Sequence, residues 1–139
     1  MMYLAIDWGE KRIGLAVGAI FPQGAGVVDG EQSFEKIVEE IKAVITENEV
    51  EKIILGLPIL PSGDEGVLAP QIRQFGKDLE KLCGLEVIYE PEEYTSIEAK
   101  GQFVSHSKLP DRKSGKLDEM AAILILEQFL DHIKDQSNF

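Results

Sequence analysis

The sequence of 139 residues contains a single cysteine, Cys83. One cysteine cannot form an intramolecular disulfide, and no histidine or second cysteine stands near it at metal-ligand spacing, so a disulfide framework is excluded. The expected location is therefore a reducing compartment, the cytoplasm. The sequence also lacks a hydrophobic run of transmembrane length and a charged leader before an apolar segment. We expect neither a membrane span nor a signal peptide.

Positive charge is scarce as well, with 14 Lys and Arg against 25 Asp and Glu and a net charge of −11. Such a surface repels phosphate over most of its area, which argues against tight binding of long nucleic acid. One stretch, residues 106–116, differs because it is basic by three charges. Its cations are Lys108, Arg112, Lys113 and Lys116. This stretch can steer phosphate, in a manner sensitive to salt.

Hydrophobic residues make up 44% of the chain and charged residues 28%, which is the balance of an ordinary globular protein. A chain of this length suits one domain with one core, and no repeat or linker interrupts it. We therefore expect a single domain over residues 1–139.

The first half of the sequence predicts a hairpin followed by a helix. Apolar runs at 3–8 and 12–18 are separated by only three residues, so they should pair as antiparallel strands. A short third strand is expected around 26–28. Apolar residues at helical spacing then predict an amphipathic helix over 34–48, with Ser33 as its N-cap.

The second half alternates strands and helices. A buried strand is expected over 52–57 and a last strand over 85–90, ended respectively by Gly56-Leu57-Pro58 and by Pro91. Between them lies a helix whose apolar stripe is Leu68, Ile72, Phe75, Leu79 and Leu82.

Two further helices are expected, one over about 96–104 and a last one over 117–134 that is apolar nearly all round and so buried. Together these elements predict an α/β fold, a mixed five-stranded sheet with helices on both faces.

Three acids occupy unusual positions in this arrangement. Asp7 ends the first strand deep in the expected sheet, Glu92 follows the last strand, and Asp118 begins the last helix. A buried ionised carboxylate is costly unless a positive group meets it, and Mg²⁺ or Mn²⁺ prefers such oxygen ligands. Alone, Asp118 is also explained by the helix dipole and Glu92 by a solvated loop, whereas Asp7 is harder to explain in that way.

Four segments, residues 4–17, 54–58, 92–96 and 116–126, resemble in order and spacing the successive motifs of the YqgF (RuvX) family. The resemblance implies an RNase H-like fold and a Holliday junction resolvase-like nuclease assigned to processing of the small-subunit (pre-16S) ribosomal RNA precursor. It also implies that Asp7, Glu92 and Asp118 are the metal-binding and catalytic acids.

One motif departs from the family pattern, which has Asp-Glu-Arg where this chain has Pro91-Glu92-Glu93. A cation expected near the site is thus an anion, and Glu93 is an alternative ligand to Glu92. Phosphate contacts would then come from other cations. The candidates are Lys11, Arg12, Lys108, Arg112, Lys113 and Lys116.

Three functions remain open on the sequence. The first is a Mg²⁺- or Mn²⁺-dependent endonuclease acting on ribosomal RNA precursor or on branched DNA. The second is a non-catalytic RNase H-like factor that binds nucleic acid or ribosome-assembly partners, which the loss of the Arg favours. The third, phosphoryl transfer in the manner of two-domain actin-like kinases, is disfavoured by the length of the chain. The sequence does not determine the oligomeric state.

Overall fold

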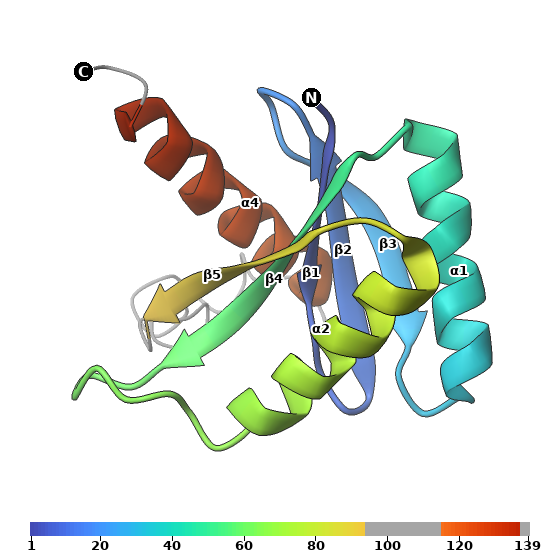
Figure 1. The fold of residues 1–139 in the computed structure, drawn as a ribbon, viewed down its shortest axis with the longest axis horizontal. Helices are drawn as coiled ribbons and strands as arrows, with labels where there is room; N and C mark the ends of the chain where they lie inside the picture. Colours follow the sequence, from blue (N-terminus) through green and yellow to red (C-terminus); the bar gives the residue numbers. More distant parts are fainter. Residues whose placement is uncertain (94–114, 137–139) are drawn as a thin grey trace.

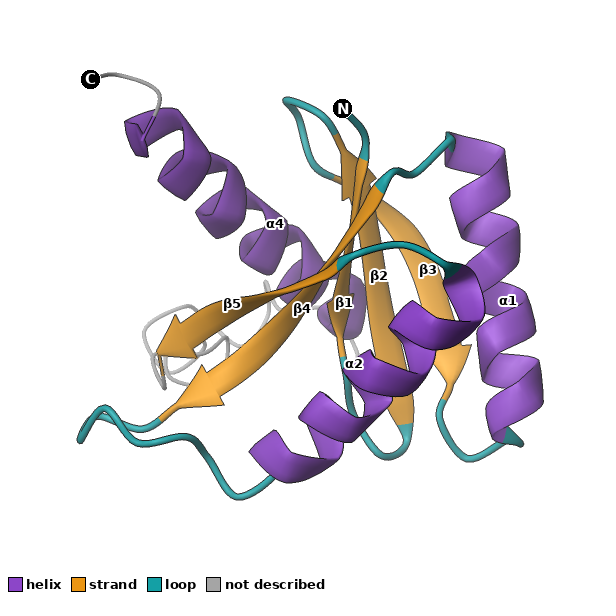
Figure 2. Ribbon diagram, in the orientation of Figure 1, coloured by secondary structure: helices purple, strands orange, loops and turns teal. Residues whose placement is uncertain are grey.

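The computed structural model describes residues 1–93 and 115–136. Five strands form one sheet in the order β3-β2-β1-β4-β5 (Figure 1). The strands are β1 (Tyr3–Asp7), β2 (Arg12–Gly18), β3 (Gln23–Asp29), β4 (Lys52–Ile59) and β5 (Val87–Glu93), and the helices are α1 (Phe34–Asn48), α2 (Ala69–Cys83) and α4 (Lys116–Gln136). The first three strands are antiparallel neighbours, whereas β1, β4 and β5 run parallel, so the sheet is mixed as expected (Figure 2).

Helices cover the sheet on both faces, with α1 and α2 on one side and α4 on the other (Figure 1). Successive side chains of a strand point to opposite faces, so each strand contributes to both cores. On β1, Leu4 and Ile6 pack in the core beneath α1 and α2, whereas Tyr3 and Ala5 pack against α4. This alternation decides which polar side chains lie on the same face.

The prediction of α1 is confirmed at both ends. The backbone of Ser33 is extended and its side chain accepts a hydrogen bond from the Lys36 N–H, so it caps the helix. The buried stripe of Ile37, Val38 and Ile41 then packs on the sheet.

Two expected strand ends are wrong, because both strands continue through a proline. Strand β4 extends past Pro58 to Ile59. Its ladder to β1 stops at Leu55, so the missing N–H of Pro58 interrupts no hydrogen bond between these two strands. Strand β5 extends past Pro91 to Glu93, because β5 is the edge strand and one of its sides needs no donors. Glu92 therefore lies within a strand and not after one.

The predicted apolar stripe lies on the correct face of α2, but fewer residues of α2 and α4 are buried than expected. Leu68 precedes α2 and is 38% exposed, and Leu82 in its last turn is 50% exposed, so neither belongs to the core. Helix α4 is not buried all round, because it packs one face on the sheet while Met120 on another is 38% exposed. The helix expected over 96–104 lies outside the described residues.

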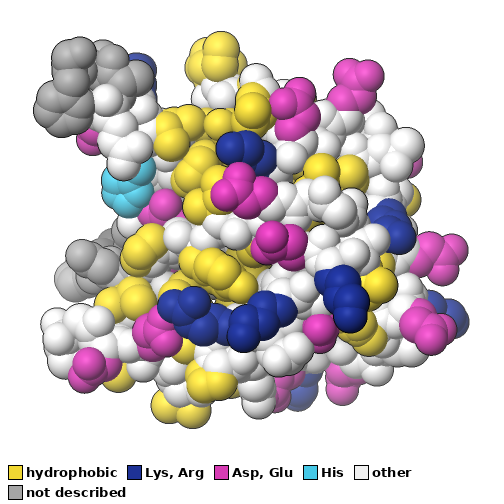
Figure 3. Space-filling view, in the orientation of Figure 1, with side chains coloured by type: hydrophobic (Ala, Val, Ile, Leu, Met, Phe, Trp, Pro, Cys, Tyr) yellow, Lys and Arg dark blue, Asp and Glu magenta, His cyan; other side chains and the backbone are white. Residues whose placement is uncertain are grey.

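The surface on the side of α2 mixes Lys and Arg with Asp and Glu side chains (Figure 3). This is the pattern of solvated helix faces and not of a single-sign patch. Among the described residues, the helices are all too short or too polar to cross a lipid bilayer.

Candidate active site

Asp7 is the last residue of β1 and follows Tyr3 and Ala5 on the face that α4 covers. Its partner across the antiparallel ladder is Gly14 of β2. In the parallel ladder, Ile6 pairs with Leu55, so the next residue of β4, Gly56, lies beside Asp7. The Asp7 side chain is thus flanked by two positions without side chains, which leaves room over it.

The two glycines allow other parts of the chain to approach the sheet closely. A Cβ atom on Gly14 would lie 2.0 Å from the backbone oxygen of Asp118, so the start of α4 rests directly on β2. A Cβ atom on Gly56 would lie 2.6 Å from Ile125 Cδ1 and 3.4 Å from Glu92 Oε2. Both glycines therefore allow α4 and the Glu92 carboxylate to come close to the sheet.

Glu92 and Asp118 approach the same face from different elements. Glu92 of β5 pairs in register with Pro58, two residues past the pair formed by Gly56 and Glu90. It is partly buried, as is Asp118 in the first turn of α4. The side chain of Glu93, the alternative ligand, lies outside the described side chains.

The electrostatics of Asp7 report on this proximity. The pKa of Asp7 is raised from 3.8 to about 7, most of all by burial and then by the charges of Glu92 and Asp118. Acids that raise the pKa of a third in this way lie within a few ångströms of it or face it through protein of low dielectric constant. The structure therefore brings together the three acids that the sequence singled out.

Asp118 also meets a cation. Its Oδ2 atom is 3.1 Å from Nε of Arg12, the first residue of β2. Both atoms are buried, and neither makes a hydrogen bond of normal geometry within residues 1–93 and 115–136. An ion pair that places two orphaned polar atoms beside the other acids indicates a site that is incomplete without a further charged group.

The donor atoms of the three acids suit a divalent cation, but their side chains are not already arranged around one position. Carboxylate oxygens are the ligands that Mg²⁺ and Mn²⁺ prefer, and the buried Asp118 Oδ2 atom accepts no hydrogen bond from the residues that the structure describes. Within residues 1–93 and 115–136, however, no group of three or more His, Cys, Asp or Glu side chains is already arranged to hold a metal ion. The Asp118 carboxylate lies against the Arg12 guanidinium in this structure.

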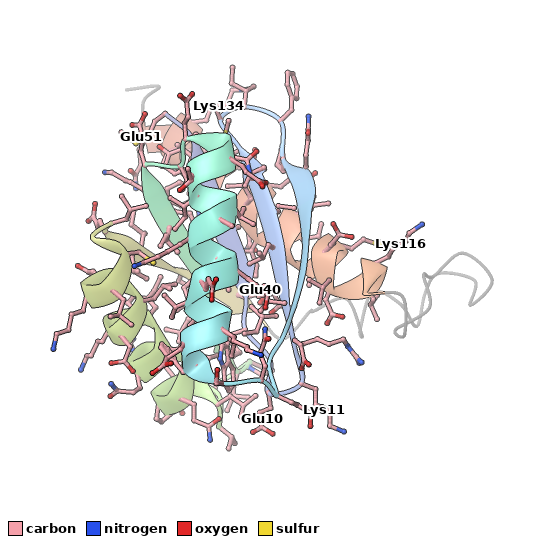
Figure 4. The ribbon with its side chains drawn as sticks, turned by 90° about the vertical axis from the view of Figure 1, so that its right-hand side faces the viewer. Glu10, Lys11, Glu40, Glu51, Lys116 and Lys134 are labelled. Atoms are coloured by element: carbon pink, nitrogen blue, oxygen red, sulfur yellow. The ribbon has the colours of Figure 1, made fainter. Side chains whose placement is uncertain are left out.

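The predicted phosphate-binding cations fall into three groups. Arg12 lies at the acids, whereas Lys11 is exposed in the turn between β1 and β2 (Figure 4). Lys116 is exposed at the start of α4, two residues before Asp118 (Figure 4). The other three, Lys108, Arg112 and Lys113, lie outside the described residues.

One residue at the site was missed by sequence reasoning. The Oε2 atom of Glu119 accepts a hydrogen bond of 2.9 Å from the backbone N–H of Gly26 in β3. Gly26 has φ of +101°, a conformation open to glycine, next to a register shift between β2 and β3. Glu119 thus fixes the first turn of α4 to the sheet beside Asp118. In the sequence it is indistinguishable from an acid placed there by the helix dipole.

A second polar pair lies toward the other end of α4. His132 Nδ1 is 2.8 Å from Glu90 Oε2, and the Glu90 side chain is only 4% exposed. Burial raises the pKa of Glu90, while His132 acts in the opposite direction. Both residues border a cavity of about 430 Å³ that also meets Tyr3 and Lys52. No role for His132 was visible in the sequence, because its partner is distant along the chain.

The fold is that of RNase H-like nucleases and resolvases. RuvC of Thermus thermophilus, in a structure titled as a complex with Holliday junction substrate, superposes with a TM-score of 0.55 at 15% identity over 95% of this chain and 96% of that one. The fowlpox virus Holliday junction resolvase gives a TM-score of 0.57 at 17% identity, over 98% and 99% of the two chains.

Within that class the family is established by sequence. Residues 1–132 match the RuvX family, described as "Holliday junction resolvase", and the chain belongs to this family. A protein of Trichormus variabilis is 35% identical over 92% of this chain and 86% of its own length, and one of Lactococcus lactis is 32% identical over 92% of each. Both relatives are named "Putative pre-16S rRNA nuclease". The resemblance inferred from the motifs is confirmed.

Proposed function

We propose that this chain is a divalent-metal-dependent endonuclease that hydrolyses phosphodiester bonds in the precursor of small-subunit ribosomal RNA. The observation that carries the proposal is the convergence of Asp7, Glu92 and Asp118 from β1, β5 and α4 on one face of the sheet. Family membership and the names of the relatives support the same reaction class. The whole chain acts as one catalytic domain.

Asp7, Glu92 and Asp118 would hold Mg²⁺ or Mn²⁺. When bound, such a cation supplies Lewis-acid polarisation of the phosphodiester and lowers the pKa of a water molecule. The protein's part is to present the carboxylates in ionised form. Because the pKa of Asp7 is about 7, this acid is half protonated near neutral pH in the absence of a cation.

Substrate phosphates would be held by the cations around the acids. Arg12 is at the site itself, and its planar guanidinium can bind a phosphate through two hydrogen bonds. Lys11 is exposed at the hairpin turn, and Lys116 is exposed at the start of α4. The basic stretch with Lys108, Arg112 and Lys113 would extend this contact, and its interaction should weaken as salt rises.

Two alternative functions predict different experimental results. The family description favours a four-way DNA junction as a second substrate class for the same acids. The replacement of the family Arg by Glu93 favours a non-catalytic scaffold that acts with ribosome-assembly partners in the cytoplasm. The first alternative keeps the metal requirement and the second removes it, so a single experiment separates all three.

The test incubates the purified protein with ribosomal RNA precursor and with a four-way DNA junction, each with Mg²⁺, Mn²⁺ or EDTA. We expect cleavage of the RNA with either metal, none with EDTA, and a loss of at least a hundredfold in Asp7→Asn and Asp118→Asn. Glu10→Gln is the matched control, because it removes the same charge from an exposed turn residue close to Asp7. It should cleave as the wild type does.

Each outcome has one interpretation. Cleavage of the junction but not of the RNA would reassign the substrate to branched DNA. Full activity in Asp7→Asn would reject the acid site. If neither substrate is cut and calorimetry detects no carboxylate-dependent binding of Mn²⁺, the scaffold function is the correct one.

A further inference from the structure

Arg12 contacts an acid that the proposed function needs for a cation. The distance from its Nε to Asp118 Oδ2 is 3.1 Å, and both atoms are shielded from solvent. Arg12 reaches this position because residues 12, 14 and 16 of β2 alternate onto the α4 face, where Gly14 leaves the backbone open to the start of α4. The contact is therefore built by the same packing that places Asp118.

The pair does not have the geometry of a structural ion pair. Buried salt bridges that stabilise a fold satisfy their polar atoms with well-aligned hydrogen bonds, since desolvation otherwise outweighs the attraction. Here neither Arg12 Nε nor Asp118 Oδ2 makes a hydrogen bond of normal geometry. The guanidinium compensates the charge of Asp118 without a directed bond, so a better ligand for that oxygen can displace it.

Charge balance points to what displaces it. Three carboxylates that lie together need more positive charge than one guanidinium brings, and a divalent cation brings twice as much. Mg²⁺ binds carboxylate oxygen at about 2.1 Å, closer than any guanidinium nitrogen can come. A cation at Asp118 Oδ2 would face the positive charge of Arg12 at very short range, so both groups cannot use this oxygen at once.

We infer that Arg12 and the divalent cation exchange at Asp118: Arg12 holds the carboxylate in the metal-free protein and turns to a phosphate of the substrate when the cation binds. This inference rests on the proposed function. The Arg12 side chain is 38% exposed, so the rest of it has a path toward solvent. The planar donors of Arg12 match the oxygens of a phosphate. Arg12 would thus replace the phosphate contact of the family Arg, whose position is occupied by Glu93 in this chain.

The exchange predicts opposite effects of one substitution on two ligands. Removing the guanidinium in Arg12→Gln frees Asp118 for the metal, so Mn²⁺ should bind about fivefold more tightly, as expected for an ion pair of this exposure. The same variant lacks the phosphate contact, so the KM for ribosomal RNA precursor should rise about tenfold or more at saturating Mn²⁺. A residue with a merely structural role would weaken both.

Calorimetric titration with MnCl₂ tests the first effect in the wild type, Arg12→Gln, Arg12→Lys and Lys11→Gln. Lys11→Gln is the control for metal affinity, because it removes one positive charge from the neighbouring exposed residue, and it should change the affinity less than twofold. Arg12→Lys keeps the charge but loses the planar fork, so its affinity should lie between those of the wild type and Arg12→Gln. It carries the test if Arg12→Gln does not fold.

The exchange is overturned if the wild type binds Mn²⁺ through Asp7 while the Arg12 variants bind it equally or more weakly. A wild type that shows no Asp7-dependent binding of Mn²⁺ would instead reject the proposed function, and the exchange with it. A thermal-unfolding series gives a readout independent of activity, because Mn²⁺ should raise the Tm of Arg12→Gln more than that of the wild type.

Discussion

The face of the sheet beneath α1 and α2 is apolar along each central strand, whereas the face beneath α4 changes from apolar to charged toward the edge where β1 and β5 end and β2 begins. On β1, Leu4 and Ile6 serve the first face, and Tyr3, Ala5 and then Asp7 serve the second. The same alternation thus produces the larger core on one side and, on the other, a smaller core with the candidate active site beside it. The comparison teaches that one face of the strands serves stability alone, whereas the other face combines packing with the candidate chemistry.

The strongest test of this division is a methyl group on the α4 face. In Gly14→Ala the new Cβ would lie 2.0 Å from the backbone oxygen of Asp118, so the start of α4 must move. We expect a loss of about 3 kcal/mol or more in the free energy of unfolding and a loss of RNA cleavage of at least a hundredfold. Chemical denaturation and single-turnover cleavage measure the two effects.

Gly66→Ala is the control for Gly14→Ala, because the nearest heavy atom to its added Cβ is at 3.4 Å, an ordinary contact. It should fold and cleave almost as the wild type does. Equal behaviour of the two alanine variants would show that the contact of α4 with β2 does not position the site.

A cavity on the opposite face should have the complementary effect. Ile41 of α1 is fully buried beneath the sheet, and Ile41→Ala should destabilise the protein by about 2–4 kcal/mol. Because α1 packs on the face of the sheet opposite to α4 and Asp118, the kcat of the folded fraction should be unchanged. A drop in kcat at a temperature where the variant is fully folded would contradict the separation of the two faces.

Removing the Asp7 charge should raise the free energy of unfolding, although it should abolish RNA cleavage. The pKa of Asp7 is about 7 in the folded protein and 3.8 as a free group, so the folded state binds this proton more tightly. In metal-free buffer the free energy of unfolding should therefore fall as pH rises from about 4 to about 7. Asp7→Asn removes this contribution and should be roughly 2 kcal/mol more stable than the wild type at pH 8.

The difference between Asp7→Asn and the wild type should become small as the pH falls below 3.8, where the wild-type acid is mostly protonated in both states. Denaturation curves at several pH values, with EDTA present, measure it. A wild type that is the more stable protein at pH 8 would mean that Asp7 is not held against other charges.

The smallest expected effect concerns Glu119, which fixes α4 to Gly26 of β3. Glu119→Ala should lower the free energy of unfolding by about 1 kcal/mol and weaken Mn²⁺ binding, because Asp118 is then less well positioned. Glu119→Gln keeps an oxygen that can accept the Gly26 N–H and should restore most of both. Failure of Gln to rescue would show that the charge of Glu119, and not its hydrogen bond, matters.

Local patterns predicted much of this molecule. The stripe of α1 and its Ser33 cap define a helix from short-range information, and both ends are correct. The strand ends at Pro58 and Pro91 were wrong, because whether a proline interrupts a strand depends on which neighbours the strand has at that point. That information is in the strand order and not in the local sequence.

The candidate site also has a part that the sequence predicted and a part that it did not. Asp7, Glu92 and Asp118 were identified from awkward positions and from the family motifs, and the structure places their charges together. The partners of these acids were not identified, since Arg12 meets Asp118 only after the whole chain has folded. Contacts between distant segments leave no periodic signal that a reading of the sequence can detect.

Pro91 has a consequence for the behaviour of this protein in a crowded cell. It sits in the outermost of the strands that the structure describes, in register with Leu57, and its ring nitrogen has no hydrogen to donate to a further strand. An extended segment of another molecule would find a gap there when adding itself as a sixth strand. The protein can thus keep a strand that carries a candidate catalytic acid at its rim without inviting edge-to-edge aggregation.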